Sequence, residues 1–225
     1  MKKPTVDYSG FRLRRINEPR FSHLKLLLSW LGYFLMYVLT ENLIPPEKCH
    51  IVHSPLDDLI PFREEFLIAY CFWYALIVIS LLYFLLYDVD SFKKLQVFII
   101  ITQVVAMAIY IIYPTRQVLR PEVFERDNFL THLTALIYTA DTDTGVCPSL
   151  HVAYSLGIAS VWVKYKGASW VWKTFIVVTA IMICLSTMFV KQHSAIDVFG
   201  AIALSLLAES LVFYVIYPKK KEKKE

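Results

Sequence analysis

Residues 95–113 read LQVFIIITQVVAMAIYIIY, a run of nineteen residues without one charged side chain. The hydrocarbon core of a bilayer is about 30 Å thick, and a helix needs about 20 apolar residues to cross it. The run therefore predicts a membrane-spanning helix, and five comparable runs lie elsewhere in the chain. The six predicted spans are residues 24–43, 66–87, 95–113, 149–163, 170–190 and 196–217. The fourth is short, and burial among the other helices is the alternative to a lipid-facing position.

The composition is also typical of a membrane protein. The chain has 225 residues, of which 57% are hydrophobic and 15% aromatic, and its mean hydropathy is +0.51. An ordinary soluble domain is less apolar. We expect an all-α integral membrane bundle of six helices. Its parts are a basic N-terminal segment over residues 1–23, one six-span membrane domain over 24–217 and a basic tail over 218–225.

The positions of Lys and Arg predict the orientation. These residues gather in segments 2–20, 93–94, 164–166 and 219–224, which share one side of the membrane if there are six spans. Because short cytoplasmic loops carry an excess of Lys and Arg, we expect both termini in the cytoplasm, at a plasma or inner membrane. Nucleic-acid binding is not indicated, because the chain between the basic ends has no groove-reading motif.

Three polar clusters fall on the opposite side of the predicted membrane. The first is YPTRQVLRP, residues 113–121, in which Arg116 and Arg120 are four positions apart. On a helical turn they would point the same way, and two guanidinium forks suit a phosphate. The alternative is contact with lipid headgroups at the membrane interface.

The second cluster is GVCPSLH, residues 145–151, where an apolar helix is predicted to begin. Free backbone N–H groups at a helix start form an anion site. Ser149 could add a hydroxyl donor, and His151 would lie in the first turn beside the anion. The alternative for His151 alone is a polar residue satisfied at the interface.

The third cluster is STMFVKQHSAID, residues 186–197. His193 and Asp197 are spaced i, i+4, so that in a helix the carboxylate could orient the imidazole, as in a catalytic triad. Lys191 would add a cation for phosphate. A capping and anchoring turn is the alternative. Together the three clusters supply a nucleophile, an acid, an orienting carboxylate and an anion clamp, which is a set that phosphoryl transfer requires.

The order and spacing of the clusters resemble the type-2 phosphatidic acid phosphatase superfamily. Its three motifs are a basic stretch that ends in Arg-Pro, then Pro-Ser-x-His, then Ser-Arg followed by His and Asp. Here they correspond to Arg120-Pro121, to Pro148–His151, and to Ser186-Thr187 with His193 and Asp197. The resemblance covers the chain from the third predicted span onward, and the predicted six-span layout extends it.

The resemblance implies a role for each of these residues. His193 would attack phosphorus and become a phosphohistidine, Asp197 would orient it, and His151 would protonate the leaving oxygen. Arg120 and Ser149 would hold the phosphate. No cofactor and no metal would take part. Arg116 and Lys191 are further phosphate-binding candidates that rest on charge and position alone.

Two departures from the family pattern concern phosphate-binding cations. Tyr113 stands where the family has a Lys, and Thr187 stands where it has an Arg. The second departure resembles the branch of inositol phosphorylceramide synthases, which pass a phospho-headgroup to an alcohol instead of water. Hydrolysis of a lipid phosphomonoester and transfer to an alcohol therefore both stay open. Asp141 and Asp143 either contact headgroup hydroxyls or belong to a solvated loop.

The expected partners are the bilayer and a lipid substrate, and the oligomeric state stays open. Rival classes are a non-enzymatic transporter, which would place ionisable groups in its spans, and an inactive scaffold. Glu209 is the clear candidate for a carboxylate deep in a predicted span. A disulfide between Cys49 and Cys147 also stays open, because sequence does not give the distance between the two residues.

Overall fold

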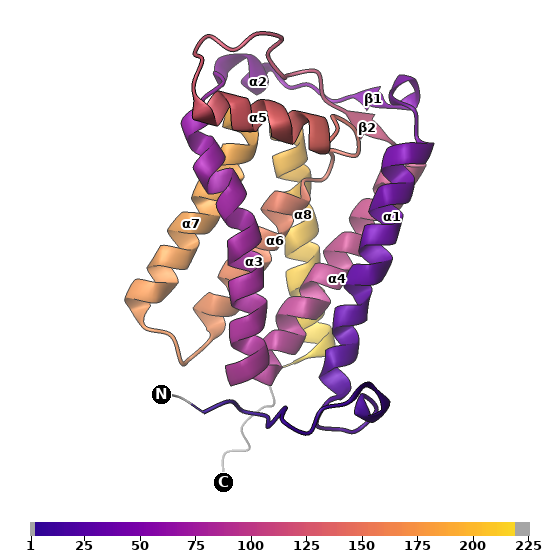
Figure 1. Cartoon of the computed structure of the whole chain (residues 1–225), viewed down its shortest axis with the longest axis vertical. Coiled ribbons are helices and arrows are strands. Elements are labelled where there is room, and N and C mark those ends of the chain that lie inside the picture. Colours follow the sequence, from indigo (N-terminus) through magenta and orange to yellow (C-terminus); the bar gives the residue numbers. More distant parts are fainter. Residues whose placement is uncertain (1–2, 219–225) are drawn as a thin grey trace.

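The structure is a computed structural model, and it describes residues 3–218. It is all-helical apart from two strands of two residues each (Figure 1). Within the described part, five helical segments are long and apolar enough to cross a membrane. They are Ser22–Leu43, Glu64–Tyr87, Val89–Ile112, Trp170–Phe189 and Ala195–Ile216. The first joins the short helix Ser22–Leu28 to α1 (Ser29–Leu43), the second contains α3 (Leu67–Tyr87), and the others are α4 (Val89–Ile112), α7 (Trp170–Phe189) and α8 (Ala195–Ser210) with the π-helix Leu211–Ile216.

The fourth predicted span corresponds to α6 (Leu150–Lys164), which has 15 residues and is shorter than the five long segments. It is the central helix, because α3, α4, α7 and α8 all pack against it. Most of its side chains are buried. At Gly157 a Cβ atom would lie 2.4 Å from the ring of Phe98, so α4 and α6 approach closely there. This burial agrees with the alternative that the sequence left open.

The start of α4 differs from the prediction. The helix begins at Val89, whereas the apolar run begins at Leu95. The side chain of Asp88 caps the helix by accepting a hydrogen bond from the backbone N–H of Ser91 at 3.3 Å. Residues 93–94, predicted as a loop, therefore lie in the first turns of α4. Hydropathy marks where lipid begins, and it does not detect a charged helical extension beyond that point.

The end of the bundle that carries α2 (Pro55–Leu59) and α5 (Phe129–Ala140) is called the α5 end below (Figure 1). The proline-containing segment between α1 and α3 holds short helices and β1 (His50–Ile51). The segment 114–146, which lies between two of the predicted spans, contains β2 (Thr115–Arg116) and α5. In Figure 1, α5 lies across the end of the bundle.

The helix α5 has a clear local cause. Asn128 accepts hydrogen bonds from the backbone N–H groups of Leu130 and Thr131, at 2.9 and 3.1 Å, and Thr131 bonds back to the Asn128 N–H at 3.0 Å. This reciprocal cap satisfies backbone donors that a helix start leaves free. The helix is also amphipathic, with Thr131 and Thr134 buried against the bundle.

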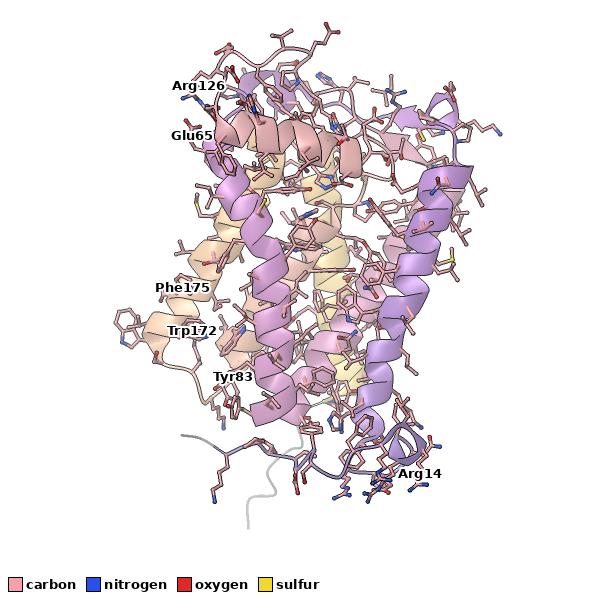
Figure 2. The ribbon with its side chains drawn as sticks, in the orientation of Figure 1. Arg14, Glu65, Tyr83, Arg126, Trp172 and Phe175 are labelled. Atoms are coloured by element: carbon pink, nitrogen blue, oxygen red, sulfur yellow. The ribbon has the colours of Figure 1, made fainter. Side chains whose placement is uncertain are left out.

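The N-terminal segment and the end of the last helix lie at the opposite end of the bundle (Figure 1). Figure 2 places Arg14 there, and Glu65 and Arg126 at the α5 end. The N-terminal segment is packed on the bundle, because Tyr8 donates a hydrogen bond to the Leu85 carbonyl at 2.8 Å and Phe21 is fully buried. Lys2 and the basic residues predicted as a tail over 219–224 lie outside the described residues.

Two further sequence questions have structural answers. All four cysteines are free thiols, so Cys49 and Cys147 do not form a disulfide. Glu209 accepts a hydrogen bond from Ser160 at 2.6 Å and forms an ion pair with Lys164 at 2.5 Å. Its carboxylate is therefore satisfied near the end of α6, as expected of a structural ion pair.

Candidate active site

His193 lies at the α5 end, directly before α8, and its ring is oriented by Asp197. The Nδ1 atom of His193 lies 3.3 Å from Oδ2 of Asp197. Asp197 is completely buried, and the backbone N–H of Ser194 also donates to Oδ2 at 2.9 Å. Because Nδ1 faces the carboxylate, Nε2 is the nitrogen left for chemistry. The predicted contact of His193 with Asp197 is thus present, but it crosses the start of α8, because His193 precedes the helix and Asp197 lies in its first turn.

His151 lies in the first turn of α6, between aromatic rings of α3. Its ring centroid is 4.4 Å from that of Tyr70 and 4.1 Å from that of Trp73. The centroids of His151 and His193 are 5.9 Å apart. Nε2 of His151 is buried and has no hydrogen-bond partner in the described part of the chain. The two histidines therefore face one compartment, each with Nε2 available.

Ser149 joins the helices that carry the two histidines. Its backbone N–H donates to the Asp197 carbonyl at 3.1 Å, and its hydroxyl oxygen accepts from the Val152 N–H at 3.5 Å as the cap of α6. The side chain is fully buried. This arrangement fixes the start of α6 against the start of α8. The hydroxyl proton of Ser149 remains a donor, as the predicted phosphate role requires.

β2, in the segment of the first cluster, contacts the segment that precedes the second cluster. β1 pairs with β2 in parallel, with His50 opposite Thr115, and Arg116 of β2 bridges Thr144. The backbone N–H of Gly145 donates to the Thr115 carbonyl at 2.8 Å. Gly145 has a φ of +60°, a conformation that glycine adopts without steric cost. The turn at this glycine leads the chain from Thr144, which bridges β2, to Ser149 at the start of α6.

Arg120 reaches the turn that carries His193. Its guanidinium donates to Oε1 of Gln192 at 2.5 Å and to the backbone carbonyls of Tyr138, Asp141 and Thr142 at 3.0, 2.8 and 2.7 Å. It also lies over the Tyr138 ring, at 4.5 Å from the centroid. Its Nε is buried without a partner among the described residues. The structure thus places Arg120 against Gln192, the residue before His193, in a network of neutral acceptors.

Arg116 and Lys191 have protein partners instead. Arg116 pairs with Asp143 at 2.9 Å. The ammonium of Lys191 donates to the carbonyls of Asp57, at 2.9 Å, and of Ile60. Burial lowers the pKa of Lys191, although the nearby carboxylates of the α2 segment oppose this shift. These contacts give both cations a structural use, whereas charge and position alone had suggested phosphate binding.

Asp57 of α2 supports the turn that carries His193, a role that was not predicted from the sequence. One of its oxygens accepts a hydrogen bond from the Ser194 hydroxyl at 2.6 Å, and the other accepts from the Ala195 N–H at 2.8 Å. Its side chain is 3% exposed. The pattern from Ser54 to Asp57 could have predicted the capping box of α2. The link to α8, 137 positions further along the chain, has no local sequence signal.

Asp141 lies in the site and not in a solvated loop. Its carboxylate accepts hydrogen bonds from the hydroxyl groups of Tyr37 and Tyr70, both at 3.1 Å, and from the side-chain amide of Gln192 at 3.2 Å. Asp143 differs from Asp141, because Asp143 pairs with Arg116 whereas the hydrogen-bond donors to Asp141 are neutral. Asp141 therefore borders the compartment of the two histidines.

Two adjacent cavities share lining residues, among them His151 and Asp141. The smaller has a volume of about 60 Å³ and is lined by His193, Gln192, Thr142 and the turn at Gly145. The larger has a volume of about 730 Å³ and runs between α1 and α3. Tyr33, Tyr37, Trp73, Asp141 and His151 line both cavities. A small pocket at the histidines thus lies beside a long apolar groove.

Thr187, at the position where the family pattern has an Arg, is buried in α7. Its backbone carbonyl accepts the N–H groups of Gln192 and His193, both at 3.0 Å. Tyr113 stacks on His50 with ring centroids 4.1 Å apart. Neither residue supplies a cation. Over residues 3–218, no group of three or more His, Cys, Asp or Glu side chains is arranged to hold a metal ion.

No family model, curated protein or solved structure matches the chain.

Proposed function

We propose that the chain is a multi-pass membrane enzyme that cleaves a phosphate ester of a lipid through a phosphohistidine on His193. The observation that carries the proposal is the pair of histidines at one cavity. His193 has Nδ1 on a buried carboxylate, and His151 has a buried Nε2 with no partner in the described chain. A carboxylate–histidine pair beside a second histidine can supply a nucleophile and an acid.

In the proposed reaction, Nε2 of His193 forms a bond to phosphorus while the bond from phosphorus to the lipid oxygen breaks. His151 donates its proton to the leaving oxygen, and Asp197 stabilises the charge on the His193 ring. Water then attacks the phosphohistidine, the N–P bond breaks, and His151 takes the proton of the water. Arg120, Ser149 and the first turn of α6 would stabilise the phosphoryl oxygens. The product from a phosphomonoester such as phosphatidate or an isoprenoid phosphate is inorganic phosphate.

A second candidate is transfer of a phospho-headgroup to an alcohol. It is favoured because Arg116 and Lys191 have partners within the protein. Arg116 is paired with Asp143, and Lys191 is held by two carbonyls. A phosphomonoester carries up to two negative charges near neutral pH, and Arg120, which contacts Gln192 beside His193, already donates to four neutral acceptors. A phosphodiester, with one negative charge, needs less compensation.

We further propose six spans, which are the five long helical segments and α6. Both termini would lie in the cytoplasm and the α5 end outside. The basic residues that gather at the end opposite to α5 support this orientation, because cytoplasmic loops are enriched in Lys and Arg. The acidic and aromatic residues of the α5 end would then face the exterior of a plasma or inner membrane.

The decisive experiment incubates purified protein with a panel of lipid phosphomonoesters and phosphodiesters, in detergent and with EDTA present. Myo-inositol and glycerol are included as acceptors, and free phosphate and new lipids are followed by mass spectrometry. The matched controls are His193→Ala and His53→Ala, the latter an exposed histidine of the same end. Phosphate release lost only in His193→Ala supports hydrolysis, and a headgroup-exchanged lipid lost only in this variant supports transfer. Equal products from wild type and His193→Ala contradict the proposal.

A further inference from the structure

The large cavity has one charged residue in its wall, and this residue lies at the same end as the catalytic histidine. Residues of α3 line the cavity from Trp73 to Leu85, twelve positions that cover about 18 Å along a helix. Towards Leu85 the wall is apolar, with Leu27, Ile77, Leu81 and Phe92. Asp141 is the charged member of the lining. A lipid with its chain along this wall would place its headgroup at Asp141 and His151.

Aromatic rings surround Asp141 at the junction of the two cavities. Tyr33 and Tyr37 come from α1, with ring centroids 6.1 Å apart, and Trp73 and Tyr74 come from α3, with centroids 5.0 Å apart. All four line the large cavity beside Asp141, and three of them also line the small one. Aromatic rings attract cations, and clustered rings of this kind recognise alkylammonium groups.

The carboxylate of Asp141 forms no ion pair within the described residues. Its three hydrogen-bond donors are neutral, and no Lys or Arg within residues 3–218 pairs with it. Glu41, one turn beyond Tyr37, also forms no ion pair there; it accepts a hydrogen bond from Thr142 at 2.5 Å, and Arg120 acts on it at longer range. Partly buried carboxylates are normally compensated by a positive charge. A cationic ligand at the junction would provide this charge.

Trp73 adds an observation that does not depend on the acidic residues. Its side chain is 7% exposed, and its indole Nε1 is buried with no hydrogen-bond partner in the described part of the chain, although the residue lines both cavities. An indole N–H is a donor only, and buried donors normally have acceptors. A phosphoryl oxygen at the histidines would satisfy it. A neutral donor of this kind suits the single charge of a phosphodiester.

We infer that the site binds a phosphodiester lipid whose headgroup carries an alkylammonium group. The ammonium lies among Tyr33, Tyr37, Trp73 and the carboxylate of Asp141, the phosphodiester lies at His151 and His193, and the chains follow the groove between α1 and α3. This inference rests on the proposed function for the place of the phosphate. It adds the substrate class, which neither the family resemblance nor the two histidines specify.

The test measures binding without turnover. His193→Ala protein in dodecyl maltoside is titrated with dodecylphosphocholine, dodecylphosphoethanolamine, dodecyl phosphoglycerol and dodecyl phosphate, and tryptophan fluorescence reports occupancy. Trp30 and Trp73 both line the groove. We expect one or both ammonium probes to bind about tenfold more tightly than the phosphoglycerol and phosphate probes. The two ammonium probes distinguish a quaternary from a primary ammonium.

The matched variants are Asp141→Asn and Glu65→Gln, each in the His193→Ala background. Glu65 is an exposed carboxylate of the same end, paired with Arg126 and absent from both cavity walls (Figure 2). We expect Asp141→Asn to remove most of the tenfold preference and Glu65→Gln to keep it. Equal affinities, a preference for phosphoglycerol, or equal effects of the two variants would overturn the inference.

Failure of the inference is distinguishable from failure of the proposed function. Ammonium selectivity in this binding assay, together with lipid turnover that His193→Ala does not abolish, contradicts the catalytic proposal alone. Turnover that requires His193 but shows no ammonium selectivity contradicts the substrate class alone.

Discussion

The carboxylate of Asp57 accepts a hydrogen bond from the hydroxyl of Ser194 at 2.6 Å, although the two residues are 137 positions apart. Ser194 is the cap of α8 and follows His193 directly. The short helix α2, on the segment between α1 and α3, therefore fixes the turn that carries the proposed nucleophile. Asp197 caps the same helix start from inside α8, through the N–H of Ser194. Two carboxylates thus hold one turn, and they act from different parts of the chain.

We expect Asp57→Ala to reduce kcat by more than about tenfold with little change in KM, because a catalytic group that shifts by about 1 Å loses up to about 10²-fold in rate. The loss of two buried acceptor contacts should also reduce the free energy of unfolding by about 1–3 kcal/mol. Steady-state kinetics and denaturant unfolding measure the two effects. The control is Asp58→Ala, which removes an exposed carboxylate paired with His53. A normal kcat in Asp57→Ala contradicts the positioning role.

Lys191→Met separates a structural role of this cation from a phosphate-binding role. The Lys191 ammonium donates to the carbonyls of Asp57 and Ile60, so we expect a loss of about 1.5 kcal/mol in the free energy of unfolding and an unchanged KM. Arg120→Gln is the comparison, because Arg120 contacts Gln192 beside the proposed nucleophile, and this variant should raise KM or lower kcat. A higher KM in Lys191→Met without a change in stability would restore the phosphate role predicted from sequence.

The sequence predicted the parts of the site that depend on local spacing. The four-residue spacing of His193 and Asp197 predicted their contact, although His193 lies just before α8 and not on a helical turn, and Ser149 precedes an apolar helix as a cap does. Charge patterning predicted less. It suggested Arg116 and Lys191 as phosphate ligands. In the structure a carboxylate binds Arg116 and two backbone carbonyls bind Lys191, all from segments distant in the sequence.

The sequence could not predict features that arise from packing of distant segments. The cavity between α1 and α3 depends on how the helices pack, and no periodicity in either run encodes the gap. α5 was missed although its cap pattern, from Asn128 to Thr131, was readable, because a 12-residue helix between two spans lacks the length that hydropathy detects. The central position of α6 was left open because a short apolar run fits either a buried or a lipid-facing helix.

The pKa of the Cys147 thiol depends on burial and on the charge of Asp197. Burial raises the pKa of the Cys147 thiol to about 12, and the negative charge of Asp197 and a hydrogen bond to it act in the same direction. At pH 9 about 0.1% of this thiol is then ionised, whereas an unperturbed thiol is about half ionised. We therefore expect iodoacetamide to alkylate Cys147 more than about 100-fold more slowly in folded than in unfolded protein.

The raised pKa of Cys147 also makes the stability of the fold depend on pH. Its contribution to the free energy of unfolding is fully present below the ordinary thiol pKa and is lost as the pH rises towards 12. Peptide mapping by mass spectrometry measures the rate at Cys147. Asp197→Asn should increase the rate in folded protein, and an equal rate in wild type and Asp197→Asn contradicts the contact between the two side chains.

Gly157→Ala tests the close approach of α4 to the central helix. A Cβ atom at Gly157 would lie 2.4 Å from the Phe98 ring, so either the ring or the helix must shift. Overpacking of this kind costs about 1–3 kcal/mol, and we expect the free energy of unfolding to fall by this amount. Phe98→Leu in the same chain should recover most of the loss, as a positive coupling in a double-mutant cycle. Gly32→Ala, with nothing within 4 Å of its Cβ position, is the control; it should not destabilise the protein and should stabilise α1 by up to about 1 kcal/mol.

His151→Ala should reveal the acid of the proposed reaction through its dependence on the leaving group. Nε2 of His151 is buried without a partner in the described chain, and its ring faces that of His193, so its proton is available to a leaving oxygen. An alkoxide needs this proton and a nitrophenolate does not, because the nitrophenolate is stable as an anion. General acid catalysis contributes about 10²–10⁴-fold, so kcat/KM for an alkyl phosphate ester should fall by about this factor, and that for a nitrophenyl ester much less. An equal loss for both esters would show that His151 acts through binding or folding. His53→Ala, at an exposed histidine, should change neither rate.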